Sequence, residues 1–322
     1  MATLEPAYPQ NLYKSAEGYA QIMQWYESAV TRLPIPVESR YVNTRYGQTH
    51  MLTCGDPAAP PLLLVQGYGA SAPLWHKQLA DFAQHYRVYA LDIVGQPGKS
   101  APMLPGLFGD GYAQWMVDVL DALEIERADV AGVCLGGWIV MKLAAYAPER
   151  LKRAVMLSPV GIASFKIYVR SGIPLVLNFG RDMDAAGLRL LRMAFTPPGS
   201  GLQFDRELAR AFVPVIKHYR VGVVAGIGSG TPSPRELWAG TRALVKFVRG
   251  EPAATLRKMA VPTLLLVGEH EAIYNPRAAV RRAQRHIPDV IAEIIEGTGH
   301  ATIYDRPDVV NPRILRFLQV GT

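Results

Sequence analysis

A short segment flanked by glycines holds the residue with the clearest chemical potential in this chain. It reads GVCLG at residues 132–136, with Cys134 at its centre. An apolar, strand-like stretch precedes it at 128–133, and a helix-like stretch follows at 135–146. A strand, a sharp turn and a helix form the setting that pushes a nucleophile out at the end of a sheet. The sequence therefore predicts that Cys134 is a thiol nucleophile.

Strand-like and helix-like segments alternate on both sides of this turn, and they are the elements that must position it. The strand-like runs are 40–46, 49–54, 61–66, 87–92, 128–133, 153–158, 262–268 and 290–295. The main helix-like runs are 74–85, 112–123, 135–146, 276–286 and 308–318. This alternation predicts an α/β fold with a doubly wound, mostly parallel sheet.

The alternation stops for about ninety residues after Pro159. Helical patterns at 186–195, 206–219 and 235–248 stand there between joints rich in glycine and proline. The sequence thus predicts a helical lead-in over 1–36, a sheet core over 37–159 and 256–322, and a helical insertion over 160–255.

Taken together, these motifs resemble the α/β-hydrolase superfamily, with a cap inserted after the sixth strand. In that family a carboxylate follows the seventh strand and a histidine follows the eighth. The chain reads GEHEAIY at 268–274 and GTGH at 297–300. The resemblance implies a triad of Cys134, Glu271 and His300 in the family's chain order. Glu269 is the alternative acid.

The resemblance also implies two backbone N–H groups that bind a developing oxyanion. One belongs to Leu135, directly after the nucleophile, and the other to Tyr68 in the loop after the third strand. That loop reads QGYG, so Gln66 stands where the family usually has histidine. Gln66 would either brace the loop or contact substrate, and Trp138 and Trp238 are further candidates for substrate contact. Trp138 lies on the predicted elbow helix and also suits the core.

The segment DIVGQPGKS at 92–100 has the GKS ending of a phosphate-binding loop, but it lacks the first glycine of that motif. It resembles instead the hydrolase family's Asp-x-x-Gly-x-Gly-x-Ser turn with one extra residue. We interpret it as a structural loop near the rim of the active site.

Cysteine elbows of this kind are similar to those of dienelactone hydrolase-like and polyhydroxyalkanoate synthase-like members. They imply a hydrolase that cleaves an ester, lactone or thioester through an acyl-Cys134 intermediate. An acyltransferase or cyclase, which passes the acyl group to an acceptor other than water, is the alternative. A non-catalytic small-molecule receptor is a third hypothesis, and a cysteine introduced in place of a natural serine is also open.

Charge is concentrated in the insertion. Residues 161–250 carry 13 Lys and Arg against 5 Asp and Glu, whereas the whole chain has a net charge of +7. This favours a small-molecule acyl substrate that is anionic or linked to a carrier. No basic run with interleaved aromatics is present, so we expect no binding of nucleic acid.

The remaining composition fits a cytoplasmic enzyme. Cys54 and Cys134 are the two cysteines, too few for a disulfide framework or a cysteine zinc site. No run reaches the ~18 apolar residues of a membrane span, and the first ten residues do not resemble a signal peptide. We expect no metal and no organic cofactor, and we make no prediction about the oligomeric state.

Overall fold

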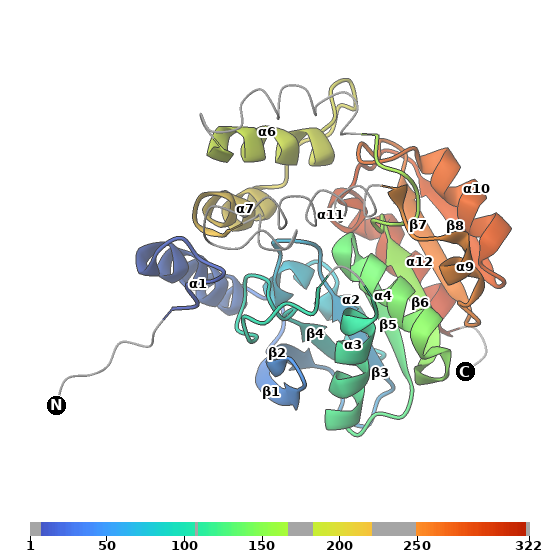
Figure 1. The fold of residues 1–322 in the computed structure, drawn as a ribbon, viewed down its shortest axis with the longest axis horizontal. Coiled ribbons are helices and arrows are strands. Elements are labelled where there is room, and N and C mark those ends of the chain that lie inside the picture. Colours follow the sequence, from blue (N-terminus) through green and yellow to red (C-terminus); the bar gives the residue numbers. More distant parts are fainter. Residues whose placement is uncertain (1–7, 107–108, 167–182, 221–248, 320–322) are drawn as a thin grey trace.

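Eight strands form one central sheet in the computed structural model, which describes residues 8–106, 109–166, 183–220 and 249–319 (Figure 1). The strands are β1 (Glu38–Thr44), β2 (Gly47–Cys54), β3 (Pro61–Val65), β4 (Arg87–Leu91), β5 (Ala128–Val133), β6 (Leu151–Leu157), β7 (Thr263–Gly268) and β8 (Val290–Ile295). Their order across the sheet is β1-β2-β4-β3-β5-β6-β7-β8.

All neighbouring strands from β4 to β8 in this order are parallel, whereas β2 runs antiparallel to both of its neighbours, β1 and β4. The central strands are short and apolar. β5 and β7 are buried along their whole length, because helices cover both faces. The predicted doubly wound, mostly parallel sheet is confirmed.

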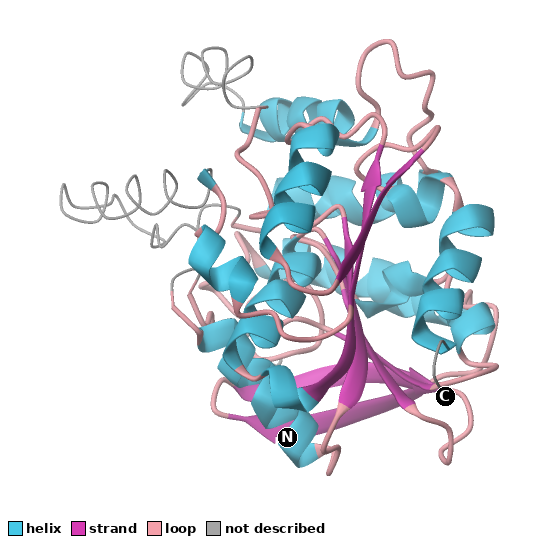
Figure 2. Ribbon diagram, turned by 90° about the vertical axis from the view of Figure 1, so that its right-hand side faces the viewer, coloured by secondary structure: helices cyan, strands magenta, loops and turns pink. Residues whose placement is uncertain are grey.

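Helices lie on both sides of this sheet (Figure 2). One apolar core gathers α3 (Gly111–Ala122), α4 (Leu135–Tyr146) and α10 (Pro276–His286) against one face. The other core gathers α2 (Leu79–Phe82), α11 (Thr302–Asp305) and α12 (Pro307–Gln319) against the opposite face. The short helix α9 (Ala253–Arg257) packs beside α4 and α10. Two 3-10 turns, η1 (Ala72–Trp75) and η2 (Pro148–Arg150), join these layers.

Two helices of the predicted insertion, α6 (Met183–Phe195) and α7 (Arg206–His218), stand between β6 and β7 in the chain and lie above the sheet in Figure 1. Asp205 begins α7, because its carboxylate accepts the N–H groups of Glu207 and Leu208. The N-terminal helix α1 (Ala16–Thr31) packs against α7, and Tyr13 pairs with Tyr219 just beyond that helix.

One predicted helix is wrong. The pattern at 74–85 indicated a continuous helix, but the structure has η1 and the short α2 with a break between them. At the break the N–H groups of His76 and Gln78 bond to carbonyl groups three residues back. The amide of Gln78 bonds to the Ile303 carbonyl and to Asn311, so long-range contacts hold the break. The predicted helix at 235–248 lies outside the described residues. None of the described helices is long and apolar enough to cross a membrane.

Candidate active site

The turn that holds Cys134 is forced by close backbone packing on both sides of it. Cys134 stands alone between β5 and α4, with φ 53° and ψ −111°. A Cβ atom on Gly132 would lie 2.3 Å from the carbonyl group of Gly136. A Cβ atom on Gly136 would lie 2.0 Å from the carbonyl oxygen of Val65, at the end of β3. Both positions therefore require glycine, and the chain can turn only with Cys134 in a strained backbone conformation.

A buried histidine–carboxylate pair lies at the same edge of the sheet. His300 follows β8, and its Nδ1 is 2.7 Å from Oε2 of Glu271, which follows β7. Both residues are nearly fully buried, at 3% and 6% exposure. The other carboxylate oxygen of Glu271 accepts the N–H of Ile273 at 2.9 Å. These two bonds fix the carboxylate, which in turn fixes the ring of His300.

Glu269, the alternative acid, faces elsewhere. Its carboxylate accepts the N–H of Gly297 at 3.0 Å in an exposed position, and it lies 3.7 Å from His270. Glu271 is the carboxylate that contacts His300.

The thiol of Cys134 is the electrostatic partner on the other side of the histidine. Burial lowers the pKa of His300, but the negative charges of Glu271 and Cys134 outweigh burial and hold that pKa well above its ordinary value. Nε2 of His300 is buried and has no hydrogen bond of standard geometry among the described residues. This raised pKa favours the imidazolium form of His300.

The loop after β3 lies directly against the elbow. A Cβ atom on Gly67 would be 3.2 Å from Cβ and 3.9 Å from Sγ of Cys134. Tyr68, the predicted second oxyanion donor, directly follows Gly67 and therefore lies close to Cys134. Leu135, the predicted first donor, begins α4, where backbone N–H groups of the first turn point away from the helix.

Two buried glutamines brace this loop. Gln66 is 2% exposed; its amide reaches the Tyr304 hydroxyl at 3.5 Å, and its oxygen accepts the N–H of Gly67 at 3.4 Å. Gln96 is 1% exposed and accepts the N–H of Gly69 at 3.0 Å. Gln66 thus has the bracing contacts that the sequence allowed. Sequence reasoning missed Gln96, because its segment was interpreted only as a rim loop.

The two tryptophans proposed for substrate contact have different outcomes. Trp138 is 2% exposed within the core, and its indole N–H donates to Glu251 at 2.8 Å. Its polar atom is thus engaged within the protein, and the core interpretation fits the structure better. Trp238 lies outside the described residues.

Helices α6 and α7 bring apolar side chains over the site. The ring of Phe195, at the end of α6, lies 5.9 Å from the ring of His300. Phe212 and Val215 of α7 lie within 3.4 Å of the position that a Cβ atom on Gly69 would take. An apolar wall therefore borders both the histidine and the loop of Tyr68.

Two buried hydroxyl groups near the site, those of Tyr274 and Ser158, were not predicted from the sequence. Burial raises the pKa of Tyr274 well above its ordinary value, and the negative charges of Glu271 and Cys134 add to this, while nearby Ser158 opposes it. Ser158 follows β6 directly and has φ 42°. Its place after a central parallel strand, at the edge where such sheets bind ligands, was the signal available in the sequence.

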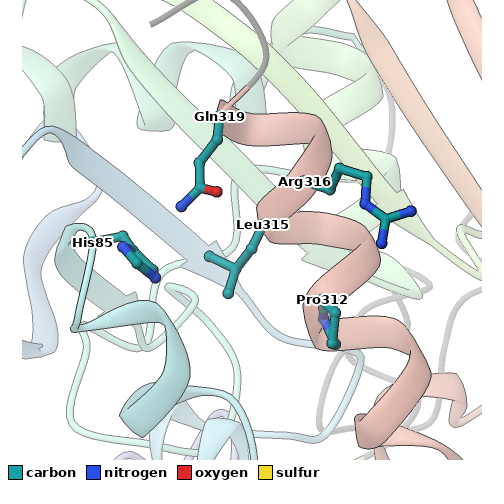
Figure 3. A pocket seen from close by; sticks show the side chains of 5 residues that line it. All are labelled: His85, Pro312, Leu315, Arg316 and Gln319. Atoms are coloured by element: carbon teal, nitrogen blue, oxygen red, sulfur yellow. The ribbon is translucent and has the colours of Figure 1, made fainter.

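A separate surface hollow is lined by His85 and by Pro312, Leu315, Arg316 and Gln319 of α12 (Figure 3). None of these residues belongs to the site around Cys134. No cluster of His, Cys, Asp and Glu that could hold a metal ion exists among the described residues.

Comparison with known proteins identifies the family to which this fold belongs. The chain is 34% identical over 304 residues to "Uncharacterized carboxylesterase nap" of Bacillus subtilis (strain 168), covering 93% of this chain and 92% of that protein. It is 32% identical over 315 residues to "Carboxylesterase YbfK" of the same organism, covering 96% and 97%. The crystal structure of carboxylesterase CesB (YbfK) from Bacillus subtilis superimposes with a TM-score of 0.76 at 30% identity, covering 95% of this chain and all of that one. Residues 60–307 match the family described as alpha/beta hydrolase fold, and this chain therefore belongs to the α/β-hydrolase family.

Proposed function

We propose that this protein is a carboxylesterase-type hydrolase that cleaves esters through an acyl-Cys134 intermediate. The observation that carries the proposal is the buried pair of Glu271 and His300, 2.7 Å apart, at the same edge of the sheet as Cys134. Two relatives named as carboxylesterases, each matched over nine-tenths or more of this chain, support an ester as the substrate.

The first half of the reaction uses the thiolate of Cys134. Its sulfur attacks the ester carbonyl carbon, and the N–H groups of Leu135 and Tyr68 bind the oxyanion. When the tetrahedral intermediate collapses, the bond from carbon to the alcohol oxygen breaks. His300 gives its proton to the departing alcohol, and a thioester on Cys134 remains.

The second half resolves the thioester with water. Neutral His300 takes a proton from water, the hydroxide attacks the thioester carbonyl, and the carbon–sulfur bond breaks. The carboxylic acid leaves, and the thiolate and imidazolium are restored. Glu271 holds Nδ1 of His300 throughout, so that Nε2 faces the reacting atoms.

A cysteine in place of the serine that esterases usually carry makes the intermediate a thioester. A thioester is activated towards other acceptors, so transfer to an alcohol or amine is the second candidate function. The apolar wall of Phe195, Phe212 and Val215 supports it, because a dry site slows attack by water. The acyl part of the substrate should be apolar for the same reason.

An anionic or carrier-linked substrate stays a prediction. Within the insertion Arg210 forms an ion pair with Glu207, and the same carboxylate also pairs with Arg32 at the end of α1.

Steady-state kinetics with short-chain esters tests the nucleophile. Cys134→Ala should lower kcat by ~10⁴-fold or more, and His300→Ala should lower it comparably, because the two act as a unit. Cys54→Ala is the matched control and should keep wild-type kcat. Full activity of Cys134→Ala would contradict the proposal.

Product analysis separates the two candidate functions. Wild-type protein is incubated with an ester and a graded concentration of a second alcohol, and free acid and new ester are quantified. Free acid as the main product at all alcohol concentrations supports the hydrolase. New ester in excess of free acid at low alcohol concentration would favour the transferase.

A further inference from the structure

A second group of Ser, His and Asp residues lies well away from Cys134. Ser39 comes from β1, His50 from β2, and Asp92 directly follows β4. These strands occupy one end of the sheet, and β3 separates β4 from β5, which leads to Cys134 (Figure 1). The α/β-hydrolase machinery described above uses none of these three side chains.

The contacts of His50 are those of an acid–base relay. Its Nε2 lies 2.6 Å from the hydroxyl of Ser39, and its Nδ1 lies 2.8 Å from Oδ2 of Asp92. In a catalytic triad Nδ1 of the histidine faces the carboxylate and Nε2 faces the serine, and His50 has the same arrangement. The side chains of His50 and Asp92 are fully buried, whereas Ser39 is exposed. The reactive oxygen therefore meets solvent while the groups behind it are shielded.

The carboxylate behind the histidine is held in place. Oδ1 of Asp92 accepts the N–H of Ala72 at 2.8 Å, and Oδ2 also accepts the N–H of Lys99 at 3.0 Å. The hydroxyl of Tyr26 lies 3.3 Å from Nδ1 of His50. Because backbone groups fix both oxygens, Asp92 cannot turn away, and it can stabilise a positive charge on His50.

The exposed ring of Tyr41 covers the histidine from the solvent side. The two ring centroids are 4.8 Å apart, and Tyr41 is 48% exposed. Tyr41 stands two residues along β1 from Ser39. An apolar surface for the organic part of a small reagent is thus present beside the serine.

We propose that Ser39 is a second nucleophile, a site that small activated acyl or phosphonyl donors modify covalently. In the step, the hydroxyl proton of Ser39 passes to Nε2 of His50 and Oγ bonds to the carbonyl carbon or phosphorus. The bond to the leaving group, a phenolate or fluoride, breaks and carries away the electron pair. The imidazolium, paired with Asp92, later releases the proton to water.

The proposal covers single modification and not turnover. Ser39 lies on the exposed part of β1, an edge strand of the sheet. Because this surface offers little binding before the reaction, the acyl or phosphonyl group is held chiefly by the covalent bond to Ser39. The inference does not depend on the function proposed for Cys134.

Labelling with an alkyl fluorophosphonate tests the proposal. The Cys134→Ala protein is used, so that the elbow cannot react, and peptide mass spectrometry measures the labelling rate of each serine. Ser39 should react at least ~100-fold faster than two exposed control serines, Ser28, which accepts from Arg32, and Ser164, which donates to the carbonyl of Arg249. Ser39→Ala should lose the main adduct, and His50→Gln should lower the rate on Ser39 to that of the control serines.

A second measurement covers the case in which His50→Gln does not fold. The preference for Ser39 over Ser28 should vanish when the Cys134→Ala protein is unfolded in urea, because it depends on the assembled relay. Labelling of Ser39 no faster than the control serines in the folded protein would overturn the proposal and leave the three residues a structural network. A preference that persists in urea would overturn it equally.

Discussion

At the scale of single residues, two features define the site: a strained backbone at Cys134 and a histidine, His300, that a carboxylate holds in place. Cys134 has a positive φ that L-residues rarely adopt, at a cost of about 1–3 kcal/mol. One hydrogen bond joins His300 to Glu271, and the N–H of Ile273 fixes that carboxylate, so the histidine ring is oriented. Strain at Cys134 and a fixed His300 are the two properties that the proposed triad requires.

The strain at Cys134 predicts an unusual stability ranking. Cys134→Gly should be about 1 kcal/mol more stable than Cys134→Ala, because glycine adopts positive φ without steric cost. The matched pair is Cys54→Gly and Cys54→Ala in β2, where alanine should be the more stable residue. Urea unfolding of the four variants measures this. Equal stability of the two Cys134 variants would contradict strain at the elbow.

Removing the negative charge of Glu271 should lower the pKa of His300. Glu271 is the first of the groups that raise this pKa against burial, so Glu271→Gln brings the pKa down. Nuclear magnetic resonance titration of the histidine ring measures the change. Glu269→Gln is the control, because its carboxylate bonds to Gly297 and not to His300, and should leave the pKa unchanged. A pKa equal in both variants would exclude Glu271 as the charge partner.

At the scale of elements, the contact between the start of α4 and the end of β3 determines the position of Cys134. The glycines that permit this contact have no room for a methyl group. If α4 or β3 shifted to make room for a methyl group, Cys134 would move relative to Gly67 and the loop of Tyr68.

Gly136→Ala should therefore destabilise the protein by ~3 kcal/mol or more, because the new Cβ atom would lie 2.0 Å from the Val65 carbonyl oxygen. The matched control is Gly187→Ala in α6, where the new atom meets only the Ile216 side chain, at 2.9 Å. That change should cost clearly less than Gly136→Ala, since only a side-chain methyl group has to move and alanine favours a helix. Thermal unfolding compares the two. A neutral effect of Gly136→Ala would contradict the packing described for the elbow.

Elements with strong local patterns were predictable from the sequence. The ranges of β5, α4, α10 and β8 agree with the sequence prediction, because apolar periodicity and terminal glycine, proline or asparagine mark them locally. The helix expected at 74–85 was wrong, because the break depends on contacts of Gln78 with residues more than 200 positions away. No local pattern reveals such contacts.

At the scale of the whole molecule, two apolar cores lie on opposite faces of the sheet. Asp129 in β5 is a carboxylate buried beside them. Its side chain is 3% exposed and lies 3.7 Å from Arg153. Burial raises the pKa of Asp129 to about 6, although Arg153 and Lys152 oppose the shift.

This raised pKa predicts a pH-dependent cost to folding. Stability from protonated Asp129 is fully present below the pKa of the unfolded chain and is lost as pH rises through about 6. The stability of Asp129→Asn relative to wild type should therefore increase by about 1 kcal/mol between about pH 5 and about pH 8. Urea unfolding at both values measures it, with Asp121→Asn, an exposed residue, as control. A difference independent of pH would contradict the burial of a charged Asp129.

The site was predictable to the extent that motifs lie next to strands. Cys134, His300 and Glu271 each follow a recognisable parallel strand, so their convergence was expected. Ser158 also follows a parallel strand directly, which was the signal available for it, whereas no local pattern marks Gln96 or Tyr274 as contacts of the site. The domain boundaries, the cytoplasmic location and the substrate stay predictions.

The most direct test of the central claim is mass spectrometry of the acylated protein after a short pulse with an activated ester. We predict one acyl group in thioester linkage on the peptide of Cys134, which accumulates in wild-type protein and decays as free acid forms. Cys54 should stay unmodified, because burial raises its pKa to about 11, against the opposing charge of Arg87. An acyl group on a residue other than Cys134, or turnover with no acyl-enzyme at any pulse time, would contradict the account.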